Sequence, residues 1–147
     1  MTYKKFLLLL LRLGLGWLMF YAGWSKLMAP TAFSAASYLN HASTFAGFYH
    51  ALASARTLKV VDFLNVWGQI AIGVSLILGL WVKWSARAAA LLMLLYYFPV
   101  LNFPHLTSDS SSYIVDEHII YGLGFLLLSA FNAGRIFGLD SMRKRTY

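Results

Sequence analysis

The sequence predicts an all-α membrane protein, a polytopic four-helix bundle that forms a single domain over residues 1–147. Two features of composition predict it: 60% of the residues are hydrophobic and only 12% are charged. A soluble domain carries about twice this charged fraction. The third feature is four long apolar runs, at about 6–28, 61–82, 86–103 and 114–137. Each run is near the ~20 residues that cross a hydrocarbon core of roughly 30 Å.

The distribution of basic residues predicts the orientation of these spans. With the N-terminus inside the cell, nine of the twelve lysine and arginine residues fall on the cytoplasmic side, where basic residues of short connections remain. Both termini are therefore expected in the cytoplasm, and the chain is expected to be a multi-pass protein of the inner (plasma) membrane. This topology and anionic lipid account for the net charge of +7, so no nucleic-acid partner is expected. The absence of cysteine excludes thiol chemistry and iron–sulfur ligation within the chain.

The connections between the spans differ in length. Residues 83–85 predict a tight cytoplasmic hairpin between the second and third spans, whereas residues 29–60 form a long outer loop. Two aromatic-rich patches in this loop, 32–39 and 44–55, predict short amphipathic helices between the first and second spans. These helices either lie on the outer membrane face as a simple connector or fold over the mouth of the bundle as a functional lid.

The first span carries both of its central charges on one helical face. Arg12, Gly16, Met19, Gly23 and Lys26 share this face, and small residues together with charges indicate that it points inward. Either the two charges snorkel to the membrane interfaces, or they bind partners inside the bundle. For Arg12 the suitable partners are backbone carbonyls, a carboxylate or an anionic ligand group.

The other spans place further polar residues toward the same outer end as Lys26. Asn65 and Gln69 lie on one stripe of the second span and either bridge helices or contact a ligand. The fourth span starts at Asp116, where the helix dipole favours carboxylates but does not explain a histidine. The remaining members of this candidate site come from the end of the third span and the start of the fourth. They are Asn102, His105, Glu117, His118 and Tyr121.

Histidine and carboxylate at a membrane edge can exchange protons with a quinone headgroup. We therefore interpret Glu117 and His118 as candidate catalytic residues. Haem or zinc bound through His105 and His118 is an alternative, but no recognised metal spacing is present, so no metal site is assigned and quinone is the expected cofactor. Solute transport is a further alternative, for which four spans are few. The candidate substrate- or quinone-binding residues are Arg12, Lys26, Asn65, Gln69, Asn102, His105 and Tyr121.

Three segments resemble the DoxX/DoxD family of small four-helix membrane proteins. They are LRLGLG at 11–16 with GWSKL at 23–27, GQIAIGVSLILGL at 68–80, and GRIFGLD at 134–140. The sequence departs from the family pattern at Gln69, where many relatives carry a carboxylate, and at Gly138, where a serine is frequent.

The resemblance implies a membrane subunit of respiratory or sulfur metabolism that delivers electrons to quinone, as in a thiosulfate:quinone oxidoreductase. It also implies partners besides the lipid bilayer: another membrane or periplasmic redox subunit, or a second copy of the chain. A non-catalytic membrane anchor or scaffold for a redox partner is the alternative function, because the sequence shows no cofactor motif.

Overall fold

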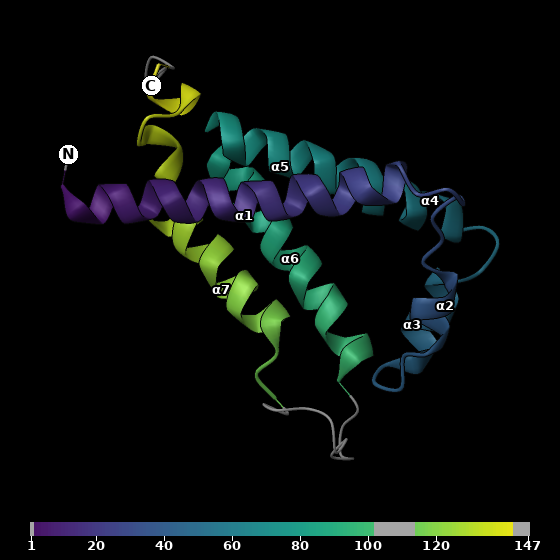
Figure 1. Cartoon of the computed structure of the whole chain (residues 1–147). Helices are drawn as coiled ribbons and strands as arrows, with labels where there is room; N and C mark the ends of the chain where they lie inside the picture. The colour runs from purple at the N-terminus through teal and green to yellow at the C-terminus, as the bar shows by residue number, and fades with distance from the viewer. Residues whose placement is uncertain (1, 102–113, 143–147) are drawn as a thin grey trace, which may run out of the picture.

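The computed structural model describes residues 2–101 and 114–142, and within these residues all regular structure is helical (Figure 1). The all-α prediction is therefore confirmed for the described part of the chain. The elements are α1 (Tyr3–Leu27), α2 (Ala36–Asn40), α3 (Ala46–Leu52), α4 (Leu58–Phe63), the π-helical segment η1 (Leu64–Gly68), α5 (Gln69–Leu78), α6 (Val82–Val100), α7 (Glu117–Ala130) and the 3₁₀ turns η2 (Ala133–Arg135) and η3 (Leu139–Ser141).

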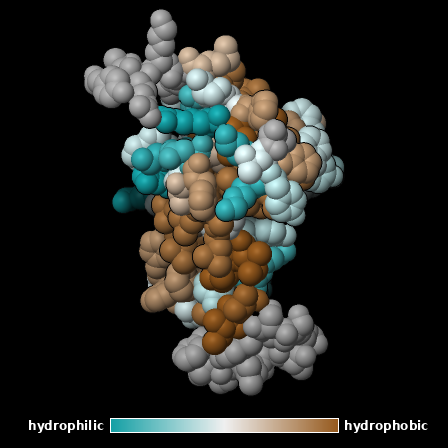
Figure 2. Space-filling view, turned by 90° about the vertical axis from the view of Figure 1, so that its left-hand side faces the viewer, coloured by the Kyte–Doolittle hydropathy of each residue, from teal (hydrophilic) through white to brown (hydrophobic). Residues whose placement is uncertain are grey.

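Within the described residues, two helices are long and apolar enough to cross a membrane: α1, and the continuous helix Leu58–Leu78 that joins α4, η1 and α5. Only 28% of the most apolar stretch of each is buried inside the protein, so most of their apolar side chains face outward, as lipid contact requires. Figure 2 views the side on which the chain ends lie and shows hydrophilic residues above a broad hydrophobic surface. These features are those of a helical membrane protein, and the arrangement of four spans stays a prediction.

The helices form two pairs that diverge from each other (Figure 1). Helix α1 packs along α5, and α6 packs along α7. The short helices α2 and α3 lie at the far end of α1, away from the two chain ends. Where the pairs meet, the core contains Leu15 and Met19 from α1, Leu76 from α5, and Phe125 and Leu128 from α7.

Glycine allows α1 and α5 to approach until their backbones touch. A Cβ atom added at Gly73 would overlap the backbone of Phe20, and one added at Gly23 would lie 2.6 Å from the carbonyl oxygen of Val66. The predicted inward face of the first span is confirmed, because Arg12, Gly16, Met19 and Gly23 are buried. Close backbone contact of this kind is typical of helix pairs in membranes.

The turn between the second and third predicted spans lies at Gly79–Trp81, so the prediction of a hairpin at residues 83–85 was wrong. Gly79 has a φ of 69° and ends α5 at Leu78, because the left-handed conformation suits glycine and stops a helix. Helix α6 then begins at Val82. The Asp140 carboxylate accepts hydrogen bonds from the backbone N–H groups of Trp81 (2.9 Å) and Val82 (3.0 Å). A residue near the C-terminus thus caps α6.

Helix α7 is shorter than the predicted span of 114–137, which was wrong at both ends. The Asp116 side chain accepts hydrogen bonds from the N–H groups of His118 and Ile119 and fixes the helix start. Asn132 and Phe137 have positive φ values of 48° and 49°, so the chain leaves the helix after Ala130. The 14 residues of α7 extend about 21 Å at 1.5 Å per residue.

Arg12 binds the segment that follows α7, residues 131–142, which we call the C-terminal hook. Its guanidinium donates hydrogen bonds to the carbonyl oxygens of Ala133 (2.7 Å), Ile136 (2.8 Å) and Phe137 (3.3 Å). Arg12 is 1% exposed, and its Nε has no hydrogen-bond partner among the described residues. Backbone carbonyls were one of the three partners expected for Arg12. They hold the hook against α1.

Candidate functional site

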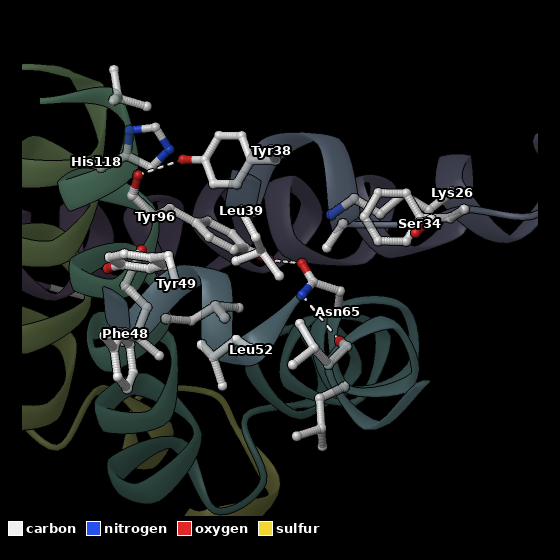
Figure 3. Close-up of a pocket in the computed structure, with 17 residues that line it drawn as sticks. Lys26, Ser34, Tyr38, Leu39, Phe48, Tyr49, Leu52, Asn65, Tyr96 and His118 are labelled. Carbon is white, nitrogen blue, oxygen red and sulfur yellow. Dashed lines mark hydrogen bonds between the residues drawn. The ribbon is translucent and has the colours of Figure 1, made fainter. Parts of the chain in front are cut away.

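A cavity of about 510 Å³ lies at the end of α1 that is remote from the hook. Residues from α1, α2, α3, the Leu58–Leu78 helix, α6 and the first turn of α7 line it (Figure 3). The walls are mainly apolar, and seven polar side chains project among them: Lys26, Ser34, Tyr38, Tyr49, Asn65, Tyr96 and His118. Small-molecule sites have this size and this combination of apolar walls with a few polar groups.

The loop between the first two long helices covers this cavity. We call residues 33–53, which contain α2 and α3, the cover. Three hydroxyl groups of the cover donate hydrogen bonds to carbonyl oxygens near the end of α6: Tyr38 to Tyr96 (2.5 Å), Tyr49 to Leu95 (2.9 Å) and Thr44 to Leu101 (2.5 Å). The cover is therefore tied to α6. The two short helices appear at the predicted patches, folded over the bundle.

Pro99 explains why one of these carbonyl groups has no hydrogen bond within the helix and can accept one from the cover. A proline inside a helix has no N–H group and removes the hydrogen bond to the carbonyl four residues earlier, which in α6 is the carbonyl of Leu95. The hydroxyl of Tyr49, which is 2% exposed, replaces the missing donor. Burial raises the pKa of Tyr49, so this hydroxyl remains protonated and able to donate at neutral pH.

Replacing Tyr49 with phenylalanine is expected to loosen the cover, because the Leu95 carbonyl then has neither a backbone nor a side-chain donor. We expect a loss of about 1 kcal/mol in the free energy of unfolding and faster proteolysis within residues 33–53. Limited proteolysis and thermal unfolding of the protein in detergent measure both effects. Tyr21→Phe is the matched control, since Tyr21 is 58% exposed on α1. Equal proteolysis of the two variants would contradict the role given to Tyr49.

A chain of polar side chains runs along one wall of the cavity. Lys26 Nζ donates to Gln69 Oε1 (2.7 Å), Gln69 Nε2 donates to the hydroxyl of Tyr96 (3.1 Å), and that hydroxyl donates to Asn65 Oδ1. The Asn65 amide ends the chain by donating to the Val61 carbonyl (3.1 Å), as Figure 3 shows. The neutral amide of Gln69 thus connects the cationic Lys26 to the Tyr96 hydroxyl.

The π-helical segment η1 contributes to this wall. Asn65 lies within η1 and is 8% exposed. The helix continues in both directions, as α4 before η1 and α5 after it. Wider π turns inside α-helices are frequent at functional sites, where they change the direction of a side chain. Here the wider turn contains Asn65, which accepts the hydrogen bond from the Tyr96 hydroxyl.

His118 and Asp116 form the opposite end of the cavity from Lys26. The Nδ1 atom of His118 lies 2.6 Å from Asp116 Oδ2, and the ring contacts Tyr96 edge to face with centroids 6.0 Å apart. Asp116 therefore both caps α7 and orients the imidazole. This arrangement leaves Nε2 as the nitrogen that can exchange a proton with a ligand.

Tyr38 lies between His118 and Lys26 in Figure 3, and its hydroxyl points inward although 40% of the residue is exposed. Burial of the hydroxyl, with added repulsion from Tyr49 and Asp116, raises the pKa of Tyr38 to about 12. Its hydroxyl therefore stays neutral at physiological pH and remains a hydrogen-bond donor to the Tyr96 carbonyl.

The sequence model of the DoxX family matches residues 7–101. The chain belongs to the DoxX family. No curated protein and no solved structure matches it. The DoxX match covers α1 to α6 and thus the polar wall, the cover and most of the cavity lining. His118, Asp116 and the C-terminal hook lie beyond the matched residues of this DoxX protein.

The structure brings together four of the residues predicted for the site. Lys26, Asn65 and His118 line the cavity, and Gln69, which does not line it, is hydrogen-bonded to Lys26 and Tyr96. Arg12 lies toward the other end of α1, where it binds the C-terminal hook. The Tyr121 hydroxyl lies 3.5 Å from Glu117 Oε2, and neither residue lines the cavity. Asn102 and His105 lie outside the described residues.

Sequence reasoning did not find the part that the cover plays in the site. Tyr38 and Tyr49 lie in the predicted amphipathic patches but were not among the predicted site residues, and neither was Tyr96. Pro99 was the signal that could have pointed to them, because it predicts an open carbonyl at Leu95.

Proposed function

We propose that this DoxX-family protein is the quinone-binding subunit of a membrane redox system, and that its cavity holds the quinone headgroup. The observation that carries the proposal is that the cavity has a polar group at each end and apolar walls between them. A quinone has a carbonyl oxygen at each end of a flat apolar ring, and the cavity offers the Lys26 ammonium at one end and the His118 ring at the other. The apolar walls suit the ring and the start of its isoprenoid tail.

Reduction of a quinone consumes two electrons and two protons and gives a quinol. In the proposal the His118–Asp116 pair supplies a proton through Nε2, since the carboxylate stabilises the protonated imidazole. The Lys26 ammonium donates a hydrogen bond to the second carbonyl and transfers the second proton to it, and both groups are then reprotonated from water. The electrons come from an outside donor, for which the family resemblance suggests thiosulfate: two thiosulfate ions form one S–S bond, yield tetrathionate and release two electrons.

The proposed topology has four membrane crossings, with the cavity toward the outer face. It is supported by the position of the N-terminus and the hook at the same side of the molecule (Figure 1) and by the excess of basic residues expected there. A cavity near the outer face would be open to a periplasmic electron donor. The donor protein, or a second membrane subunit, is part of the proposal.

Replacing His118 with glutamine is expected to lower the rate of quinone reduction about 100-fold or more, because the glutamine amide cannot deliver a proton to the quinone as the imidazole can. The protein is purified with its partners in mild detergent, and thiosulfate-dependent reduction of decylubiquinone is followed by absorbance. Quinone that copurifies is identified by extraction and mass spectrometry. His118→Gln is expected to keep quinone binding within a few-fold of the wild type.

Glu117→Gln is the matched control, since Glu117 is the neighbouring residue but does not line the cavity. We expect it to reduce quinone at the wild-type rate. An impaired Glu117→Gln beside an unaffected His118→Gln would transfer the proton role to Glu117. If neither bound quinone nor activity is found, and a stable redox partner copurifies, the chain is a non-catalytic anchor and the proposal is wrong.

A further inference from the structure

The ammonium group of Lys26 lies in the cavity, and no carboxylate of the described residues pairs with it. Its neighbours are the Gln69 amide oxygen at 2.7 Å and two aromatic rings, with Nζ 4.9 Å from the centroid of Phe33 and 5.8 Å from that of Tyr96. Amide and aromatic contacts stabilise a cation only in part. An ammonium group has three N–H donors, and one of them is used here.

Two acidic residues that contact the cavity lining are already engaged. Asp62 accepts a hydrogen bond from the backbone N–H of Ala35 (2.7 Å), and Asp116 binds His118. Among residues 2–101 and 114–142, the pair of His118 and Asp116 is the one ion pair, and no carboxylate lines the cavity. A cation kept in apolar surroundings without a counter-ion is unfavourable unless a partner arrives.

We infer that the ligand of this cavity carries an anionic oxygen, which pairs with Lys26. The inference rests on the proposed function and narrows it: the preferred ligand is an apolar molecule with one acidic headgroup, and among quinones it is one with a ring hydroxyl that is ionised at neutral pH. Apart from His118 at the far end, the rest of the lining has no charged side chain. Leu39, Leu52 and Leu95 contribute apolar surface for the body of the molecule.

The charges in the cavity also set the direction of binding. The His118 end contains the Asp116 carboxylate, so it is neutral or negative depending on the protonation of the imidazole. The Lys26 end is positive. An anionic headgroup is therefore attracted to Lys26 and repelled from the His118 end, and the opposite edge of the ring faces Nε2. This orientation is the one that the proposed proton transfer needs.

The test compares three ligands on the full-length protein in lipid nanodiscs. They are 3-decyl-2-hydroxy-1,4-naphthoquinone, which is anionic at pH 7.5, its neutral 2-methoxy ether, and decanoate. Binding is measured by quenching of tryptophan fluorescence and by calorimetry. We expect the wild type to bind the hydroxyquinone at least tenfold more tightly than the ether, as a charge-assisted hydrogen bond predicts. Lys26→Met is expected to abolish this preference.

Lys59→Met is the matched control, because Lys59 is an exposed lysine of α4 outside the cavity lining. It is expected to keep the wild-type preference, and thermal unfolding shows whether each variant is folded. The inference would be overturned if the wild type bound the hydroxyquinone and its ether equally well, or if Lys26→Met kept the preference for the hydroxyquinone. The proposed quinone site would not be affected by either result. Lys26-dependent binding of decanoate without any quinone binding would support the anion site and remove the proposed function. If none of the three binds, both are wrong.

Discussion

Replacing Arg12 with methionine is expected to lower the free energy of unfolding by about 3–5 kcal/mol, because three carbonyl groups of the hook lose their donor together. Each hydrogen bond to a charged group contributes about 1.5–3 kcal/mol, and bonds made by one side chain are not additive. A whole domain is stable by only about 5–15 kcal/mol. Thermal unfolding in detergent, followed by circular dichroism, measures the loss, and proteolysis shows release of the hook.

Arg135→Met is the control for Arg12, since Arg135 is an exposed arginine within the hook itself. It is expected to unfold within 0.5 kcal/mol of the wild type, as is usual for surface changes. Arg12→Lys should recover part of the stability, because lysine keeps the charge but cannot reach several carbonyls with a planar fork. If Arg12→Met were fully stable and instead lost quinone binding, Arg12 would be a ligand group rather than the anchor of the hook.

Gly73→Ala is expected to separate α1 from α5 and to destabilise the protein by about 1–3 kcal/mol. The added methyl group would overlap backbone atoms of Phe20, and a backbone cannot rotate away as a side chain can. Thermal unfolding measures the loss. Crosslinking between cysteines introduced at exposed positions of the two helices reports whether they still pack together.

Gly68→Ala tests whether this effect comes from packing rather than from the loss of a glycine. Gly68 lies five residues earlier in the same continuous helix, and a Cβ atom there meets nothing within 4 Å. Alanine favours helix more than glycine by up to about 1 kcal/mol, so this variant should be as stable as the wild type or more so. Equal destabilisation by both changes would contradict the close packing of α1 on α5.

The spacing of small and charged residues predicted the parts of the structure that depend on one helix face. Arg12 and Gly23 lie on the buried face of α1 as their spacing indicates. The gathering of Lys26, Asn65 and His118 at one end follows from the lengths of the helices and the direction of each, which the apolar runs already give. These features depend on periodicity within one segment, which a sequence displays directly.

The remaining features depend on contacts between distant segments. Four of residues 131–137 are apolar, so the apolar run continues past the end of α7, and the positive φ values fall on Asn132 and Phe137 rather than on glycine. The hook takes its shape because Arg12, 121 residues away from Ala133, attracts its carbonyls. The cover likewise depends on hydroxyl groups that reach α6 across 46 to 58 residues. No local pattern encodes such pairings.

The bond between Arg12 and the hook has a consequence for how the chain is made. Arg12 enters the bilayer with the first helix, more than a hundred residues before its carbonyl partners leave the ribosome. During that interval its charge must be sheltered by water, by lipid headgroups or by the insertion machinery, since an unpaired arginine inside lipid is unfavourable. Synthesis of the hook ends the exposure. A chain interrupted before Ala133 would keep a bare cation in its first helix, which is a feature that membrane quality control can recognise.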